Sequence, residues 1–341
     1  MRLKSNLLWA AAFAAATPGA ALDLSTLALG DPHLKTLPRS SEDQARITAV
    51  TRAAGDFSRS EAFEARPAGS ATVRARNDDE AFSHHSANLS FEQQLEFKLG
   101  NGLFKKIWVF SPASTRASDG LGPLYNARSC QRCHVKDGRG EVPEDPDYRS
   151  ASMFLRISVP APVPEEMQGI EDYLGTAPDP VYGGQLQDFS PPGIPPEYRL
   201  RVSYSSQVVP LNGEEPAVLR LPSYEAAELG YGPLHESAML SPRIAPPMIG
   251  LGLLEAISTE DILANVDEQD SDGDGISGRA NLTWSREFDR VMLGRFGHKA
   301  GMPTLHAQSA AAFSGDIGIS TPLFPSAAGD CTAAQVACQS A

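Results

Sequence analysis

The most restrictive feature of this sequence is a pair of cysteines, two residues apart, followed at once by a histidine. The motif reads Cys130-Gln131-Arg132-Cys133-His134, and the pattern C-x-x-C-H is typical of covalent haem attachment. The spacing has a chemical reason. Two thiols must add to the two vinyl groups on one edge of the macrocycle, while the imidazole reaches the iron from one face. The motif predicts a c-type haem held by Cys130 and Cys133, with His134 as axial ligand of the iron.

Three other roles for the cysteine pair remain to be weighed. A zinc site usually needs a second close pair of Cys or His residues, and the other two cysteines, Cys331 and Cys338, stand far away with a different spacing. A thioredoxin-type redox pair requires a βαβ context that this segment lacks. A disulfide between Cys130 and Cys133 would be strained at so short a spacing. For Cys331 and Cys338 we expect a local disulfide, formed in an oxidising compartment.

The first 21 residues have the order of a secretory signal. Arg2 and Lys4 precede an uninterrupted apolar run at 7–16, and small residues then lead to Ala21. The run is too short to span a bilayer, which needs about 20 apolar residues. We expect cleavage near Ala21 and a periplasmic protein, since covalent haem attachment occurs outside the cytoplasm. An uncleaved interfacial anchor is the alternative. No later segment resembles a membrane span.

Composition and charge narrow the function classes. Hydrophobic residues make up 41% of the chain and charged residues 21%, which is typical of a globular protein. The 29 Lys and Arg against 42 Asp and Glu produce a net charge of -13. This acidic balance argues against a nucleic-acid partner, which would require a basic footprint. The 29 Gly and 27 Pro indicate much loop.

Local patterns predict a few elements of secondary structure. Ser90 and Gln93 form a capping-box pattern before apolar residues spaced four apart, which predicts a short amphipathic helix. Residues 198–209 and 217–221 flank a turn signal at 211–215, which predicts a β-hairpin. Within 244–257 a helix can start only after Pro247. A further short helix should begin near Thr259.

An acidic loop resembles a calcium site. Asp270, Asp272 and Asp274 alternate in a D-x-D-x-D-G pattern, and the glycine permits a sharp turn. The backbone carbonyl of Ile276 would supply another ligand. The glutamate expected at position twelve of an EF-hand is absent, so affinity should be lower or another residue must complete the shell, and Asp267 and Glu268 are nearby candidates. The alternative is a solvated acidic loop without a cation.

Several segments, in order, resemble one family. They are DGLGPLYNARSCQRCHVKDGRG at 119–140, YGPL at 231–234, SPRIAPPMIGLGLLEA at 241–256, DGDGISGR at 272–279 and GRFGHKAG at 294–301. Over about residues 80–340 the chain resembles the bacterial di-haem oxidoreductases. That family is described as peroxidases related to di-haem cytochrome c peroxidases and is also labelled thiol oxidoreductase. Its members usually carry a second C-x-x-C-H domain and a Trp where His298 stands. This sequence has one such motif, so we expect a truncated frame, a split protein or a single-haem derivative.

The resemblance implies a mainly α fold, with a cytochrome c-like haem domain, much loop and a small β-hairpin insert. The domains expected are a signal peptide at 1–21, an irregular N-terminal segment at 22–80, a haem-attachment segment at 81–160, loop and hairpin at 161–235, and a remainder at 236–341 with the acidic loop and the terminal Cys pair.

The function implied is an exported c-type haem oxidoreductase with peroxidase-type chemistry, supplied with electrons by a small redox protein or cytochrome, and completed by a second haem domain or subunit. The alternatives are a single-haem electron carrier without enzymatic activity and a truncated remnant of a di-haem enzyme. Related peroxidases also hold Ca²⁺, in line with the acidic loop.

The second axial ligand of the iron decides between catalysis and simple electron transfer. The sequence does not rank the candidates, which are Met153, Met167, Met239, Met248, Met292, Met302, His235, His298 and His306. Arg139 could stabilise charge as a peroxide bond breaks, or contact a haem propionate. Trp108 and Tyr125 could relay electrons, but core packing is the simpler role for both.

Overall fold

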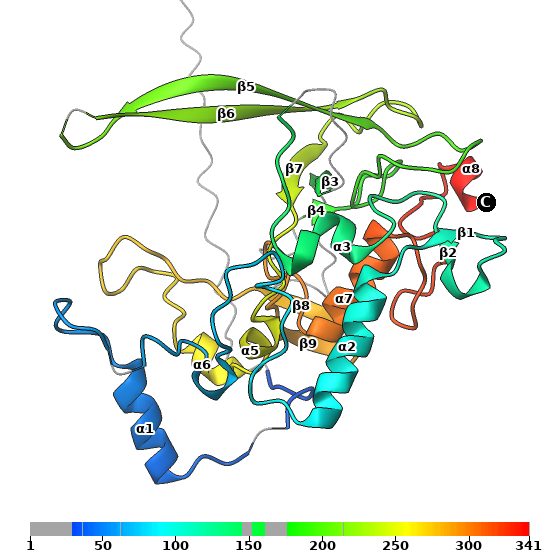
Figure 1. Cartoon of the computed structure of the whole chain (residues 1–341). Helices are drawn as coiled ribbons and strands as arrows, with labels where there is room; N and C mark the ends of the chain where they lie inside the picture. The colour runs from blue at the N-terminus through cyan, green and yellow to red at the C-terminus, as the bar shows by residue number, and fades with distance from the viewer. Residues whose placement is uncertain are drawn as a thin grey trace, which may run out of the picture.

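The computed structural model describes residues 29–35, 37–61, 63–144, 152–160, 176–213 and 215–340. Helices and strands take comparable shares of these residues (Figure 1), so the expectation of a mainly α fold is wrong. Several strands have only two to four residues, too few to give a periodic signal, and the strand at 153–160 pairs with a distant one at 239–244. The proposed signal sequence at 1–21 lies outside the described residues. No helix within the described ranges is long and apolar enough to cross a membrane.

The helices are mostly short. They are α1 (Ser41–Thr51), α2 (Phe91–Lys105), α3 (Cys130–Cys133), α5 (Leu251–Glu255), α6 (Thr259–Leu263), α7 (Leu305–Asp316) and α8 (Val336–Gln339). Helix α1 lies within the stretch expected to be irregular, and none of its residues is buried. Helices α5 and α6 begin where the prolines and the Ser258 cap predict.

The capping box before α2 is confirmed. The Ser90 hydroxyl accepts from the Gln93 N–H at 3.3 Å, and the Gln93 side chain accepts from the Ser90 N–H at 2.9 Å. Together they satisfy two backbone donors at the start of the helix. The helix continues to Lys105, beyond the short segment predicted, and ends beside α3 (Figure 1).

The strands form small sheets. They are β1 (Val109–Phe110), β2 (Asp119–Leu121), β3 (Met153–Pro160), β4 (Thr176–Ala177), β5 (Arg199–Pro210), β6 (Pro216–Ala227), β7 (Met239–Ile244), β8 (Leu282–Ser285) and β9 (Arg290–Leu293). Strand β3 lies between β4 and β7, antiparallel to both. Its alternate residues are buried in the largest hydrophobic cluster, which also includes Tyr182, Leu186 and Tyr198.

The predicted β-hairpin is confirmed and is longer than expected. Strands β5 and β6 pair without interruption from Arg199 opposite Ala227 to Pro210 opposite Pro216. The base of the hairpin is buried through Val202, whereas Val208 and Val218 near the turn are about two-thirds exposed, at 64% and 65%. In Figure 1 the two strands extend as a long ribbon past the rest of the fold.

The first residues that the structure describes pack against the C-terminal half of the chain. Leu29 packs on the cluster formed by Ala280, Leu282 and Leu293 of the β8–β9 region. Asp31 and Arg295 form an ion pair at 2.5 Å, with 10% and 1% of their side chains exposed. These contacts join segments more than 250 residues apart into one core.

Candidate functional site

The two cysteines of the motif lie at the ends of the single helical turn α3. Residues three apart on a helix lie on the same side, so the two thiols are presented together. Cys133 is buried and Cys130 half-buried, and neither is joined in a disulfide. The His134 N–H donates to the Cys130 carbonyl at 3.0 Å, which places the histidine directly after the turn.

The His134 ring is oriented by a backbone group from a distant segment. Its Nδ1 lies 2.7 Å from the carbonyl oxygen of Pro246. Since a carbonyl can only accept, Nδ1 carries the proton and Nε2 keeps a lone pair. Metal-ligating histidines commonly donate their other ring N–H to a backbone carbonyl in this way. The ring of Phe104 on α2 lies 6.1 Å from that of His134.

Three hydrogen bonds hold the loop after His134 against neighbouring segments. The carboxylate of Asp137 is buried and accepts from the Ser83 hydroxyl. The Asp137 carbonyl accepts from the Met248 N–H at 2.8 Å, and the Gly140 N–H donates to Ala245 at 2.8 Å. These contacts bring the 245–248 segment, and with it the Pro246 carbonyl, beside the motif.

The thiols are held in their neutral form. Burial raises the pKa of Cys130 to about 11, and the nearby Asp316 carboxylate adds to the rise. Burial raises the pKa of Cys133 well above its usual range. A thioredoxin-type pair needs a readily ionised thiol, so this environment does not favour that role.

The donor set fits haem better than zinc. In the described part of the chain, the groups of His, Cys, Asp or Glu close enough to share a metal ion do not include Cys130, Cys133 or His134. Two large apolar side chains in this region stand exposed: Val135, which follows His134, at 53%, and Ile249, which follows Met248, at 53%. Clustered apolar exposure marks a surface that a ligand or partner covers, and a macrocycle attached to the two cysteines would be such a ligand.

The remaining candidates for the second axial position are dispersed. Met153 and Met292 are buried, and Met167 lies outside the described residues. The backbone of Met248 adjoins the motif through Asp137. Two of the histidines have partners elsewhere: His235 accepts a hydrogen bond from the Ser237 N–H, and His306 contacts Glu287. The backbone of Met302 bonds that of Phe296, and Met239 is on β7. His298 is exposed.

Trp108 and Tyr125 pack close to the cysteine pair. They share a hydrophobic cluster with Cys130, Leu121 and Ile317. Tyr125 stacks on Phe189 at 5.7 Å, while the buried indole Nε1 of Trp108 has no hydrogen-bond partner. Core packing accounts for the position of both aromatic rings.

Arg139, after the motif, is exposed.

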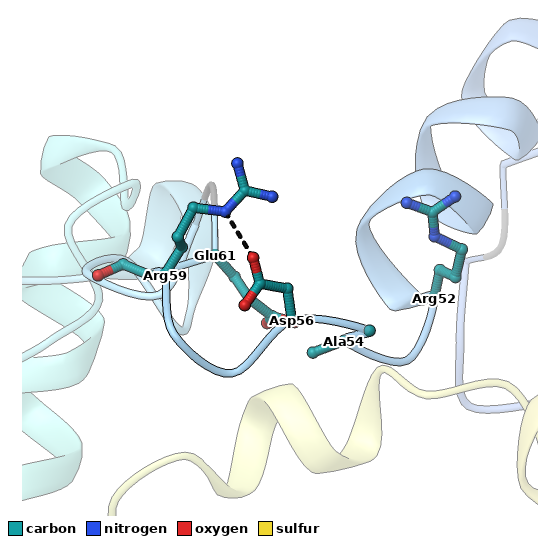
Figure 2. A pocket seen from close by; sticks show the side chains of 7 residues that line it. Arg52, Ala54, Asp56, Arg59 and Glu61 are labelled. Carbon is teal, nitrogen blue, oxygen red and sulfur yellow. Dashed lines mark hydrogen bonds and ion pairs between the residues drawn. The ribbon is translucent and has the colours of Figure 1, made fainter.

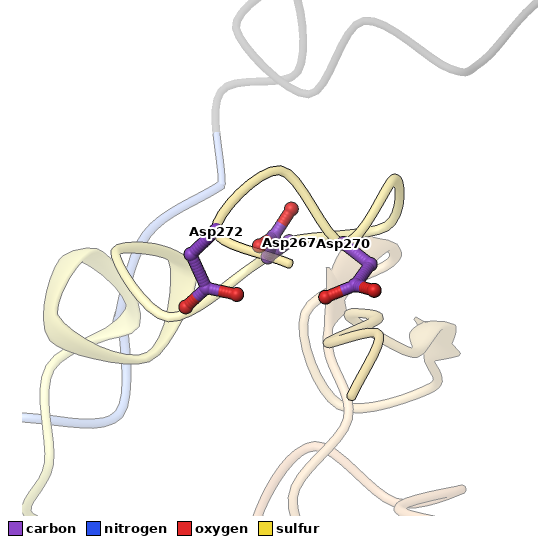
Figure 3. Close-up of side chains that lie close together, drawn as sticks. All are labelled: Asp267, Asp270 and Asp272. Atoms are coloured by element: carbon purple, nitrogen blue, oxygen red, sulfur yellow. The ribbon is translucent and has the colours of Figure 1, made fainter. Parts of the chain in front are cut away.

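The acidic loop brings together the carboxylates of two predicted ligands and of one neighbouring acid. Oxygens of Asp267, Asp270 and Asp272 lie within 4.8 Å of one another (Figure 3). Asp274 instead accepts from the Ile276 N–H at 2.8 Å. Hydrogen bonds from Ser271 lower the pKa of Asp267 and keep it ionised. Asp267 is one of the two neighbouring acids expected to complete the shell, and the backbone turn brings its carboxylate beside those of Asp270 and Asp272.

The C-terminal cysteines are joined to each other. Cys331 and Cys338 form a disulfide with their Cα atoms 6.3 Å apart. Gln335, in the loop between them, is fully buried. Its side chain donates a hydrogen bond to the buried Glu197 carboxylate at 2.5 Å. This contact ties the chain terminus to the segment that leads into β5.

A surface hollow lies elsewhere, within the loop that follows α1. It is lined by residues between Arg52 and Glu61, and Arg59 pairs with Asp56 across it at 2.8 Å (Figure 2). All lining residues come from one exposed stretch, and none belongs to the motif or the acidic loop. The hollow therefore adds nothing to the candidate site.

Neither the curated proteins nor the solved structures include a match to this chain. Residues 63–196 and 225–337 match the sequence model of a family described as "di-haem oxidoreductase, putative peroxidase". The gap between the two matched regions falls almost entirely on the β5–β6 hairpin, which is therefore an insertion relative to the family pattern. The matched residues cover most of the chain, include both the cysteine motif and the acidic loop, and place this protein in the di-haem oxidoreductase family.

Proposed function

We propose that this protein is an exported oxidoreductase that holds a covalent c-type haem and reduces peroxide. Cys130 and Cys133 would form thioethers with the vinyl groups, and His134 would bind the iron through Nε2. The observation that carries the proposal is the Nδ1 hydrogen bond of His134 to Pro246, because it leaves the Nε2 lone pair available directly after the two cysteines of the motif. Family membership supports haem and oxidoreductase chemistry.

The residues around the motif have defined tasks in this proposal. The Pro246 carbonyl fixes the tautomer and direction of the His134 ring. Asp137, bound by Ser83, keeps the loop after His134 in place. The haem, when bound, supplies one-electron exchange and, at an open axial position, activation of peroxide. The exposed apolar side chains near His134 would exclude water from one side of the macrocycle.

Export and the source of electrons complete the proposal. Haem attachment outside the cytoplasm and the Cys331–Cys338 disulfide both suit an oxidising compartment such as the periplasm. Electrons would come from a small redox protein or cytochrome. The second haem of the family would be carried on a further domain or subunit.

Optical spectroscopy of protein expressed with haem-maturation machinery tests the proposal. We expect a c-type pyridine haemochrome near one haem per chain, a mass increase that survives denaturation, and a high-spin spectrum that peroxide alters. A Cys130→Ala/Cys133→Ala variant should lose the covalent haem, while Cys331→Ala/Cys338→Ala should keep it. A low-spin spectrum blind to peroxide would instead indicate the electron carrier, and the absence of covalent haem would refute the haem assignment.

We also propose that the acidic loop binds a divalent cation such as Ca²⁺. The ligands would be carboxylates of Asp267, Asp270 and Asp272 (Figure 3), since hard cations prefer clustered oxygen donors. Calorimetric titration with Ca²⁺ should show one site, lost in Asp270→Asn. The variant Asp289→Asn, in the turn after β8, is the control. No heat of binding with the unaltered protein would overturn this proposal.

A further inference from the structure

Basic side chains gather around the haem motif of a chain that is acidic overall. Residues 98–139 contain eight Lys and Arg against two Asp, whereas the whole chain has 29 basic and 42 acidic residues. Asp137 is buried and bound to Ser83, and Asp119 accepts a hydrogen bond from Ser111. The positive charge of this stretch is therefore not cancelled within it.

Five of these residues lie at the end of α2, in α3 or in the segment between them, and we call them the basic collar: Lys105, Lys106, Arg116, Arg128 and Arg132. Lys106 donates to the carbonyl of Ala117, the neighbour of Arg116. Arg128 donates to the carbonyl of Trp108 at 3.0 Å, and the Trp108 N–H donates back to the Arg128 carbonyl at 2.8 Å. Arg128 and Arg132 stand on either side of Cys130 in the sequence. The collar thus joins the end of α2 to α3.

The collar charges are available to a partner. All its members are exposed except Lys106, which is half-buried with its ammonium 4.0 Å from the Trp108 ring centroid. Within the described residues, no member forms an ion pair with a carboxylate. By contrast, Lys136, on the other side of the motif, is paired with Glu80. Unpaired surface charges of one sign create a field that reaches about 8–10 Å at physiological salt and steers oppositely charged molecules.

An apolar patch adjoins the collar. On α2 and just beyond it, Leu99, Leu103 and Ile107 are 76%, 45% and 61% exposed. Lys105 and Lys106 stand between two of these residues. Apolar contacts beside a charged rim are the usual anatomy of a transient protein interface, whereas a small anion would need an enclosing pocket.

We propose that the basic collar docks an acidic single-electron carrier protein, which delivers electrons to the haem beside Cys130. The proposal rests on the proposed function and names the class of its electron donor. Reduction of one peroxide to two waters consumes two electrons and two protons, so two reduced carriers must dock in succession. A weak, fast, electrostatically guided contact suits such repeated exchange.

The test uses the haem-loaded full chain and two carriers that differ in charge alone. One carrier is a small monohaem cytochrome c with a basic surface, and the other is the same protein with its lysines succinylated, which makes it acidic. The collar variant is Lys105→Glu/Arg116→Glu, because these side chains form no hydrogen bond or ion pair with any residue that the structure describes. The matched variant is Arg46→Glu/Arg52→Glu on and after α1, which reverses the same charge far from α3 (Figure 1). Carrier binding is measured by calorimetry at low salt, and peroxide-dependent oxidation of the carrier by absorbance.

We expect the acidic carrier to bind and be oxidised at least about tenfold faster than the basic one, with a rate that falls as salt rises. The collar variant should lose at least about tenfold in both measurements, and the α1 variant less than about twofold. All three proteins should reduce peroxide equally with a small uncharged reductant. Preference for the basic carrier, or equal losses in the two variants, would overturn the docking proposal. Failure with the uncharged reductant would instead count against the proposed function, and the binding titration would still decide the docking.

Discussion

Replacing Arg295 with methionine tests how strongly the N-terminal segment is held to the core. Arg295 is buried and donates to Asp31 at 2.5 Å, to the Thr259 hydroxyl at 3.1 Å, to the Glu255 carbonyl at 3.3 Å and to the Ile257 carbonyl. Methionine fills much of the volume but leaves the Asp31 carboxylate with a 10% exposed side chain and no cation. Removing one partner of a buried ion pair costs about 3–5 kcal/mol.

The free energy of unfolding of Arg295→Met should therefore fall by about 3–5 kcal/mol, measured by urea denaturation followed by circular dichroism at pH 7. Because the pair is buried, the loss should persist at high salt. The double variant Arg295→Met/Asp31→Asn should lose less than the sum of the two single variants, since no unpaired charge then remains.

An exposed ion pair of similar length is the control. Arg59 and Asp56 are 2.8 Å apart, but their side chains are 80% and 46% exposed (Figure 2). Arg59→Ala should cost less than about 1 kcal/mol. If Arg295→Met cost no more than Arg59→Ala, or if the two buried substitutions were additive, the assignment of the stability to burial of the pair would be wrong.

Three further predictions concern the core. Leu155→Ala removes a fully buried side chain of β3 and should lower the free energy of unfolding by about 2–5 kcal/mol, measured in urea against Val208→Ala on the exposed hairpin as a near-neutral control. Gly122→Ala places a Cβ 2.5 Å from the backbone of Gly318, so its melting temperature should drop by several degrees, and an unchanged value would contradict that close approach. Burial raises the pKa of Glu197 from 4.5 to about 8, so its contribution to stability is present below pH 4.5 and is lost as the pH rises through 8. The melting temperature of Glu197→Gln should accordingly vary less between pH 5 and 9 than that of the unaltered protein.

The candidate site could be predicted in part because its chemistry is local. Cys130 and Cys133 need only one helical turn to stand on the same side, and His134 follows directly. The Ser90–Gln93 cap is likewise formed within four residues. The fold class could not be predicted in the same way, and the mainly α expectation failed. Strand β3 has clear alternation, yet its partner β7 begins 79 residues later, beyond any local signal.

The acidic loop depends both on its local sequence pattern and on its backbone conformation. Alternate acids predict Asp270, Asp272 and Asp274 as ligands, and positive φ angles at Asp270 and Gly273 bend the loop in which the carboxylates of Asp267, Asp270 and Asp272 lie together. Side-chain spacing alone does not encode that bend.

By itself, the sequence indicated a haem-attachment motif and predicted the helix start at α2 and the hairpin, because hydrogen bonds and turns between near neighbours require no other part of the chain. Only the tertiary structure decided which carbonyl orients His134, since Pro246 stands 112 residues away and reaches it through the bonds of Asp137 and Gly140. The same holds for the basic collar, whose members become one surface when α2 packs beside α3. Contacts of this kind depend on how buried surfaces pack together, which no short stretch of sequence specifies.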